Sequence, residues 1–440
     1  MTDAMTAGRT ALVAGGEAHT FAALARLAAR RAAELPPLER GRPFAIRPAL
    51  TLRDVSALLA AAMRGAPVAL LPALPDAEAA ALRAALPARV PDQVAALVYT
   101  SGSTGRRRCA MLDRAAFAAS AEAGASVLGW RDDDRWLACL PLSHIGGLSV
   151  LTRCLWARRA AVLADPSPRF EPAAVAGQIA RDRVTLASLV PTMLIRLLDL
   201  EPAWRPPDHL RAILLGGAPA SAALLARAAG RGLTVHTTYG MTETCSHVAI
   251  DGRTLPGIEL SLIDDRIAVR GPVLLRGFAP PDDDVPAVDR DGWLVTADRG
   301  AFDQAGHLRV IGRADDVIVS GGEKIDPSAV EAVLESVPGI AAAVVFAMPD
   351  PAWGQLVAAA LVAGPGRRPD AELAAALAAA LADRLARHER PRQIAWLAEL
   401  PLGPTGKVDR AETARRATAE LNPSAPRAPA APPPPRPRRS

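Results

Sequence analysis

The chain has 440 residues, of which 50% are hydrophobic and 22% charged, so it can bury a large core and form two or more domains. Its net charge of +5 is concentrated at one end, because residues 422–440 contain four arginines and no acid. The rest of the chain is nearly neutral and has only two tyrosines and seven phenylalanines, which argues against a nucleic-acid-binding protein.

The four cysteines form no Cys-x-x-Cys pair, and no histidine lies at metal-ligand spacing. We therefore expect neither a disulfide framework nor a zinc site, and a reducing cytoplasm as the location. The N-terminus lacks a charged segment followed by an apolar one, and no run approaches the roughly 18 apolar residues of a membrane span. These patterns predict neither a signal peptide nor a membrane anchor.

Helical and strand patterns alternate through the first 255 residues. Alanine-rich stretches with arginine at helical spacing predict amphipathic helices, the first of them at 21–35. Short apolar runs that end in glycine, proline or polar turns predict buried strands at 66–71, 95–100, 135–142, 160–165, 184–190, 210–217 and 233–240. This alternation indicates an α/β architecture.

The pattern changes after residue 255 to short strands with turn residues, and then to a smaller unit that includes a predicted helix at 372–388. We expect a large N-terminal multi-sheet α/β domain with a strand-rich subdomain over 1–312. A small, mobile α+β C-terminal domain should follow over 313–421. The Pro- and Arg-rich segment 422–440 cannot bury much surface, and its composition predicts a disordered tail.

The stretch "YTSGSTGRRRC" at 99–109 follows an apolar run and combines glycines with hydroxyl side chains. Glycines permit unusual backbone angles, and successive N–H groups and hydroxyls can donate to an anion, which describes a phosphate-binding loop. The spacing of a Walker loop is absent. On this stretch alone, a Ser- and Gly-rich surface turn is an equal alternative.

Four further segments follow in order: "TTYGMTETC" (237–245), "GWLVTADRG" (292–300), "GRADDVIVSGGEKIDPSAVE" (312–331) and "LPLGPTGKVDR" (400–410). Together with the loop they resemble the motifs of the adenylate-forming superfamily, which contains acyl-CoA synthetases, adenylation domains of peptide synthetases and luciferases. The resemblance spans about residues 95–410. It implies the two-domain α/β fold and an enzyme that uses ATP, Mg²⁺ and coenzyme A.

The resemblance also suggests catalytic roles. Glu243 would hold Mg²⁺, which takes one or two protein carboxylates with phosphate oxygens and water, and Thr242 would donate to the α-phosphate. Lys407 would stabilise charge on the transferring groups, and Asp315 would be the hinge of the mobile domain. Taken alone, the Glu243 segment could be a helix start and Lys407 a surface lysine. His144 would contact or gate the acyl group, or be only a packed histidine.

The remaining implied contacts are with nucleotide and coenzyme A. Asp298 would accept from the ribose hydroxyls, although such an aspartate could also be a solvated turn residue. Gly321 and Gly322 would lie close to the pantetheine of coenzyme A. The full set is Thr100, Ser101, Gly102, Ser103, Thr104, Gly105, Arg108, Gly216, Gly217, Ala218, Thr238, Tyr239, Gly240, Asp298, Arg313, Gly321 and Gly322.

Within the superfamily, "YGMTE" and "VIVSGGEKIDP" resemble acid–CoA ligases more than peptide-synthetase domains. The segments 140–155 and 187–199 and the brevity of the chain look like the o-succinylbenzoate–CoA ligases of menaquinone synthesis. The alternatives are another aryl or fatty acid–CoA ligase, an adenylation enzyme that loads a carrier protein, and an inactive nucleotide-binding relative. Expected partners are a carboxylic acid, ATP and CoA, without nucleic acid, and a homodimer is a candidate assembly.

One departure concerns the phosphate loop, which in the superfamily usually continues with Pro-Lys-Gly. Here it continues with Arg107, Arg108 and Cys109. Arg108 keeps the positive charge of the lysine but presents a planar fork, so its phosphate contact should differ. The lead before the loop is also short, which predicts a trimmed N-terminal subdomain.

Overall fold

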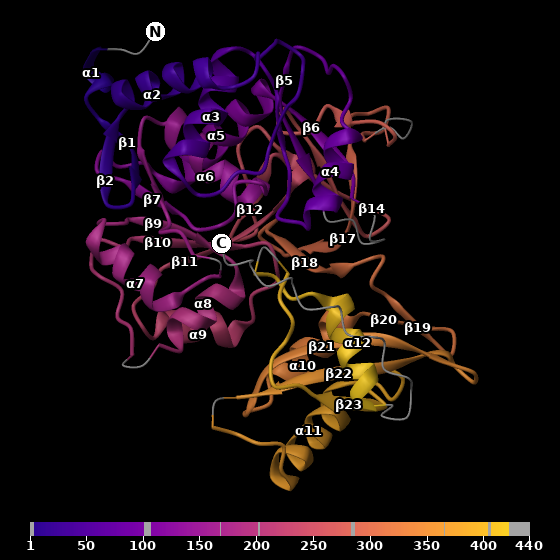
Figure 1. The fold of residues 1–440 in the computed structure, drawn as a ribbon. Coiled ribbons are helices and arrows are strands. Elements are labelled where there is room, and N and C mark those ends of the chain that lie inside the picture. Colours follow the sequence, from indigo (N-terminus) through magenta and orange to yellow (C-terminus); the bar gives the residue numbers. More distant parts are fainter. Residues whose placement is uncertain are drawn as a thin grey trace, which may run out of the picture. The chain divides into compact units, whose positions relative to one another are not determined.

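The computed structural model describes residues 4–100, 107–167, 169–200, 203–282, 287–364, 366–403 and 406–421. The predicted disordered tail therefore lies outside the described residues. The chain divides into two compact units, one made of residues 1–315 and 402–407 and the other of 316–401 and 408–440. Both units combine helices and sheets, and the mixed α/β class predicted from the sequence is confirmed (Figure 1).

The first unit contains a nine-stranded sheet of order β13-β12-β11-β10-β9-β7-β8-β1-β2. Its central strands are parallel and its outer strands antiparallel. The strands are β1 Thr10–Ala14, β2 Glu17–Thr20, β7 Arg135–Ala138, β8 Ala160–Leu163, β9 Leu186–Leu189, β10 Ala212–Gly216, β11 Val235–Met241, β12 Ser246–Ile250 and β13 Arg253–Thr254.

Side chains that alternate along the central strands build two cores, one on each face of this sheet. Trp136 and Leu186 belong to one core, whereas their neighbours Leu137 and Ala187 belong to the other. This is the pattern of strands buried on both faces, and it explains why their sequences are continuously apolar. Helices α5 (Arg114–Leu128) and α6 (Ile145–Trp156) cover the first face, and α7 (Pro172–Arg181), α8 (Pro191–Leu198) and α9 (Ala222–Ala229) cover the second (Figure 1).

Two smaller sheets complete the first unit, with orders β16-β6-β5-β4-β3 and β14-β15-β17-β18. Their strands are β3 Phe44–Ile46, β4 Val68–Leu70, β5 Val94–Tyr99, β6 Cys109–Asp113, β16 Gly277–Phe278, β14 Glu259–Ile263, β15 Arg266–Arg270, β17 Leu294–Phe302 and β18 Leu308–Arg313. The helices of the unit are α1 Ala4–Ala7, α2 Phe21–Glu34, α3 Leu52–Met63, α4 Asp76–Ala84, α5 Arg114–Leu128, α6 Ile145–Trp156, α7 Pro172–Arg181, α8 Pro191–Leu198 and α9 Ala222–Ala229, with the 3₁₀ turn η1 Thr242–Thr244.

The second unit packs its helices on a three-stranded sheet of order β21-β22-β23, beside the two-stranded ribbon β19-β20 (Figure 1). Buried leucines of α11 and valines of α10 meet the sheet in one core. The elements are β19 Ile318–Ser320, β20 Glu323–Ile325, α10 Pro327–Glu335, β21 Ile340–Asp350, β22 Gly354–Ala363, α11 Ala371–Arg384, β23 Gln393–Trp396 and α12 Arg410–Leu421.

Two predicted elements end earlier than expected. The helix predicted at 372–388 stops at Arg384, because Leu385 turns to an extended conformation and buries its side chain in the core. The Leu385 carbonyl, which lies beyond the last helical residue, accepts a hydrogen bond from Arg390 Nε at 3.0 Å. The strand predicted at 135–142 ends at Ala138 and is followed by a turn in which His144 N donates to the Pro141 carbonyl at 3.0 Å.

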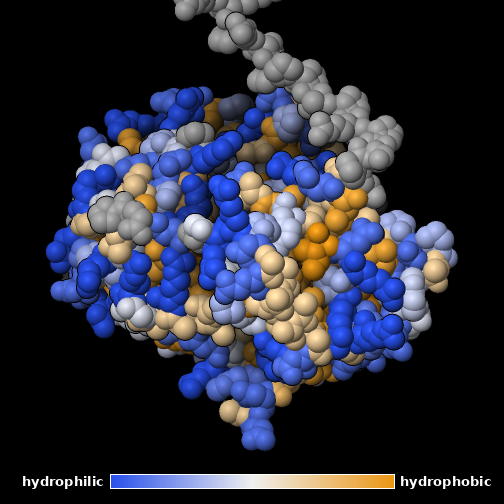
Figure 2. Space-filling model, turned by 90° about the horizontal axis from the view of Figure 1, so that it is seen from below, coloured by the Kyte–Doolittle hydropathy of each residue, from blue (hydrophilic) through white to orange (hydrophobic). Residues whose placement is uncertain are grey.

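The face shown in Figure 2 is mostly hydrophilic, with hydrophobic residues in smaller areas between the hydrophilic ones. Within the described residues, none of the helices combines the length and the apolar character needed to cross a bilayer. All four cysteines are free thiols, and three of them are buried.

Candidate functional site

The predicted phosphate loop joins two paired strands. Tyr99 of β5 and Cys109 of β6 are partners in an antiparallel ladder, and Thr100 N donates to the Arg108 carbonyl at 2.8 Å. The two ends of the loop are thus held together. Of the loop residues singled out from the sequence, five lie outside the described residues, namely Ser101, Gly102, Ser103, Thr104 and Gly105.

Glu243 lies in the η1 turn between β11 and β12, where it is half-buried. The turn is a single 3₁₀ turn and not the start of an α-helix, and Thr244 Oγ1 closes it by accepting from Met241 N at 3.0 Å. Burial raises the pKa of Glu243, and the charge of Arg108 opposes this shift. A carboxylate that burial disfavours in its charged form is suited to bind a cation.

Asp298 of β17 lies beside Tyr239 of β11 and Arg313 of β18. The Tyr239 hydroxyl donates to Asp298 Oδ2 at 2.9 Å, and Arg313 Nη1 donates to Asp298 Oδ1 at 3.3 Å. Burial raises the pKa of Tyr239, so its hydroxyl stays protonated and remains a donor. Each carboxylate oxygen keeps a further lone pair that can accept from a ligand hydroxyl.

Lys407 belongs to the first unit, because the segment 402–407 packs there. Thr192 Oγ1 of α8 donates to the Gly406 carbonyl, and Gly403 N donates to the Lys407 carbonyl at 2.7 Å. At Gly217, whose φ is +82°, a Cβ atom would lie 2.6 Å from Lys407 Cε. Glycine is thus required both by the backbone angle and by the close approach of the lysine.

The ammonium of Lys407 lies in a mixed electrostatic environment. Lys407 is reached by solvent, yet protein atoms surround it densely enough that burial lowers its pKa. The negative charge of Asp298 opposes this shift and the positive charge of Arg313 adds to it. Lys407, Asp298, Arg313 and Gly217, which the sequence places on four separate segments, therefore come together.

The glycines of the two motif strands allow close backbone contact. Gly216 is paired with Thr238 in the parallel ladder, and a Cβ atom there would lie 2.2 Å from Thr238 Oγ1. At Gly240 a Cβ atom would lie 2.1 Å from the Ser246 carbonyl oxygen. Ala218 follows β10 and is exposed.

His144 is the N-cap residue of α6. Burial, followed by the positive charges of Lys407 and Arg107, lowers its pKa to about 4. The imidazole is neutral at pH 7, and the positive charge of Lys407 reaches it.

Gly321 and Gly322 form the two-residue turn of the β19–β20 ribbon, and both have positive φ. Gly321 N donates to the Trp353 carbonyl at 3.0 Å, and a Cβ atom on Gly321 would lie 2.5 Å from the Trp353 ring. These residues belong to the second unit.

Asp315 ends the continuous part of the first unit and accepts from Arg313 Nε and Nη2, each at 2.8 Å.

The sequence analysis missed a buried polar group between α5, α6 and β12, which we call the Arg153 cluster: Arg153, Ser120, Ser149, Ser246 and His247. Arg153 is 3% exposed and donates to Ser120 Oγ at 2.9 Å and Ser246 Oγ at 3.3 Å. Arg153 Nε and His247 Nε2 are buried without a hydrogen-bond partner. No Asp or Glu of the described ranges pairs with Arg153, and burial lowers its pKa to about 10.

Gly124 allows these two unpaired nitrogens to approach the backbone of α5 closely. A Cβ atom there would lie 3.2 Å from His247 Nε2 and 3.3 Å from Arg153 Nε. A glycine inside a helix costs about 1 kcal/mol relative to alanine, so its presence within α5 indicates a local requirement for space. An arginine in "LTRCL" carries no sequence signal of burial.

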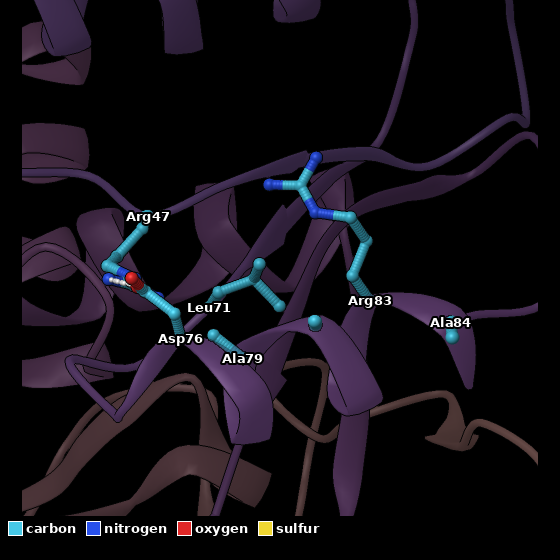
Figure 3. A pocket seen from close by; sticks show the side chains of 7 residues that line it. Arg47, Leu71, Asp76, Ala79, Arg83 and Ala84 are labelled. Atoms are coloured by element: carbon cyan, nitrogen blue, oxygen red, sulfur yellow. Dashed lines mark hydrogen bonds and ion pairs between the residues drawn. The ribbon is translucent and has the colours of Figure 1, made fainter.

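A surface pocket of about 460 Å³ lies elsewhere, between α4 and the end of β3 (Figure 3). Arg47 and Asp76 form an ion pair at its edge with an N–O distance of 3.1 Å, and Arg83 extends from α4. None of its lining residues is one of the predicted site residues. The chemistry described above therefore belongs to a different part of the molecule.

Two family models match the chain. That of the AMP-binding enzymes matches residues 75–278, and that of the AMP-binding enzyme C-terminal domain matches residues 329–407. A 2-succinylbenzoate–CoA ligase of Bacillus cereus is 34% identical over 347 residues, which are 73% of this chain and 70% of that protein. This chain belongs to the AMP-binding enzyme family. The adenylate-forming membership predicted from the five motifs is thus confirmed.

Solved structures of the family agree with the fold. The o-succinylbenzoate CoA synthetase of Bacillus subtilis in complex with its acyl-adenylate intermediate has a TM-score of 0.79 and 30% identity, covering 93% of this chain and 96% of that one. The same synthetase in complex with ATP and magnesium ion has a TM-score of 0.78 and 29% identity, covering 93% of this chain and 97% of that one.

Proposed function

We propose that the chain is an ATP-dependent, AMP-forming acid–CoA ligase that acts on 2-succinylbenzoate. A carboxylate of the acid attacks the α-phosphate of ATP and releases pyrophosphate, and the thiol of CoA then displaces AMP to form the thioester. The observation that carries this proposal is the meeting of Lys407, Asp298 and Arg313 from distant segments. The names of the similar ligases support the acid and the thiol acceptor.

The first half-reaction brings one anion against another, so the site must neutralise charge and align both groups. Lys407 supplies a mobile ammonium for the charge that develops around the α-phosphate, and Thr242 a hydroxyl. Asp298, oriented by Tyr239 and Arg313, accepts from the ribose hydroxyls. The backbone at Gly216, Gly217, Ala218, Thr238 and Gly240 forms the wall against the base.

Glu243 would hold Mg²⁺ together with phosphate oxygens and water. A single carboxylate suffices for Mg²⁺, which keeps several water ligands and is commonly completed by substrate phosphates. When bound, the ion neutralises triphosphate charge during transfer.

The Arg153 cluster explains why the acid should be a dicarboxylate. 2-Succinylbenzoate has one carboxylate to activate and a second that remains charged, and burying the second requires a cation. Arg153 is a buried cation without an acidic partner among the described residues, and its Nε is free to donate. His247 lies on β12 only four residues after Glu243, which links the cluster to the nucleotide site.

The second half-reaction needs a different arrangement of the site, because pyrophosphate departure and thiol attack make different demands. We propose that the domain formed by residues 313–421 rotates about Asp315, withdrawing Lys407 and presenting the turn at Gly321 and Gly322 to the pantetheine of CoA. His144, neutral at pH 7, would contact the acyl group. A cytoplasmic location and a homodimer remain part of this proposal.

A panel of carboxylic acids incubated with ATP, Mg²⁺ and CoA, read by mass spectrometry, tests the function. The expected result is AMP and a thioester with 2-succinylbenzoate above all other acids. A thioester with a different acid would retain the ligase and overturn the substrate. Pyrophosphate exchange without CoA consumption would indicate a carrier-loading enzyme, and ATP binding without any exchange would indicate an inactive relative.

A further inference from the structure

The guanidinium of Arg108 lies over an aromatic ring contributed by a distant segment. Its guanidinium carbon is 3.4 Å from the centroid of the Phe278 ring. Phe278 is 4% exposed and belongs to β16, which pairs with β6 directly after Arg108. The ladder fixes this contact, because Phe278 is opposite Ala110 and Ala279 N donates to the Cys109 carbonyl at 2.8 Å.

The segment that carries the ring also holds Glu243. Leu275 N donates to the Glu243 carbonyl at 2.8 Å, and Arg276 N donates to the Met111 carbonyl at 2.9 Å. The Arg276 guanidinium donates to Asp113 through Nε at 3.0 and 3.1 Å and through Nη2 at 2.7 Å. Residues 275–279 thus join the strand that follows the phosphate loop to the turn that bears the proposed metal ligand.

The contact with Phe278 limits the conformational freedom of the Arg108 side chain. A long side chain that is free at the surface populates many rotamers, and its planar fork binds phosphate only in a suitable orientation. An aromatic face attracts the guanidinium and restricts it to one plane, which leaves the N–H edge available to an anion. The charge of Arg108 already acts on the Glu243 carboxylate, so the two groups share one neighbourhood.

We propose that Phe278 is a positioning residue for nucleotide binding: its ring holds the guanidinium of Arg108 in the orientation that contacts the triphosphate of ATP. This inference rests on the proposed function, since it requires ATP as the ligand. It assigns to the Arg108–Phe278 pair the phosphate contact of this chain's loop, in which Arg107, Arg108 and Cys109 replace Pro-Lys-Gly.

The test is a double-mutant cycle on the full-length protein, read as the Kd of Mg-ATP by isothermal titration calorimetry. Phe278→Leu keeps apolar bulk but removes the ring, and we expect it to weaken binding by about fivefold. In an Arg108→Gln background the same substitution should have no further effect. A merely structural ring would instead weaken binding equally in both backgrounds, and that result would overturn the proposal.

Val273→Ala is the matched control, because Val273 is fully buried just before the segment 275–279 and its truncation lowers stability without removing the ring. It should lower the unfolding temperature as Phe278→Leu does, while leaving the Kd of Mg-ATP unchanged. Equal weakening by both variants would also overturn the role of the ring.

The calorimetric measurement needs no acid, so it separates this inference from the substrate proposal. If the wild type binds Mg-ATP and the cycle shows coupling, but 2-succinylbenzoate gives no thioester, the substrate proposal fails and the role of Phe278 stands. If the wild type does not bind Mg-ATP, both fail.

Discussion

Replacing Arg153 by methionine should increase the stability of the free protein and remove its preference for a dicarboxylate. Burial lowers the pKa of Arg153 from 12.5 to about 10, which corresponds to about 3 kcal/mol by which the folded state disfavours the charged form. Methionine has a similar length and no charge. The hydroxyls of Ser120 and Ser246 keep partners, since Ser120 Oγ donates to the Cys245 carbonyl and Ser246 Oγ donates to Ser149 Oγ.

Arg153→Met should therefore gain stability but lose activity towards the dicarboxylate. Truncating one partner of a buried, hydrogen-bonded charge pair costs about 2–5 kcal/mol, so kcat/KM for 2-succinylbenzoate should fall by roughly 30- to 5,000-fold. Two analogues complete the assay: 4-oxo-4-phenylbutanoate lacks the aromatic carboxylate, and 2-butanoylbenzoate lacks the aliphatic one. The analogue that keeps only the activated carboxylate should be used equally well by the wild type and by Arg153→Met.

Arg211→Met is the matched control. Arg211 pairs with the fully buried carboxylate of Asp134 at 2.7 Å, so its loss leaves that charge unpaired and should lower the free energy of unfolding. It should not alter the ratio of kcat/KM between the acids. Urea unfolding and steady-state kinetics measure both quantities. Wild-type discrimination between the acids in Arg153→Met would refute the assignment of the second carboxylate to Arg153.

Four further outcomes are expected. Lys407→Ala should slow adenylation by about 10²-fold or more, while thioester formation from supplied acyl-adenylate changes little; equal losses in both half-reactions would contradict its role. Tyr239→Phe removes the donor to Asp298 and should raise KM for ATP by about tenfold with kcat retained. Asp315→Pro, which fixes φ at the proposed hinge, should abolish thioester synthesis and spare one half-reaction; normal synthesis would exclude the hinge. Burial raises the pKa of Glu335 from 4.5 to about 7, so the folded protein favours the protonated side chain. The free energy of unfolding that this group contributes is fully present below pH 4.5, and about 2–3 kcal/mol of it should be lost as the pH rises towards 7. Glu335→Gln should remove this pH dependence, measured by hydrogen exchange of the second unit.

The α/β class and the family could be predicted from the sequence because their signals are local. Hydrophobic periodicity along one strand or helix determines which element forms, and each motif gathers its glycines, hydroxyls and charges within about ten residues. The predicted strand at 95–100 and the helix at 21–35 agree closely with β5 and α2, and the Thr20 cap explains where α2 begins. The family membership followed from five such motifs in order.

Contacts between residues far apart in the sequence were decided only by the tertiary structure. Ser246 lies 93 residues from Arg153, and nothing in the sequence near either residue indicates that the guanidinium is buried without an acid. The Phe278 ring reaches Arg108 only because β16 pairs with β6. The helix expected to reach residue 388 ends at Arg384, because Leu385 is extended and its side chain is buried in the core. Local sequence sets the dihedral preferences of a segment, whereas packing of the whole chain sets which charges lose water and which rings meet them.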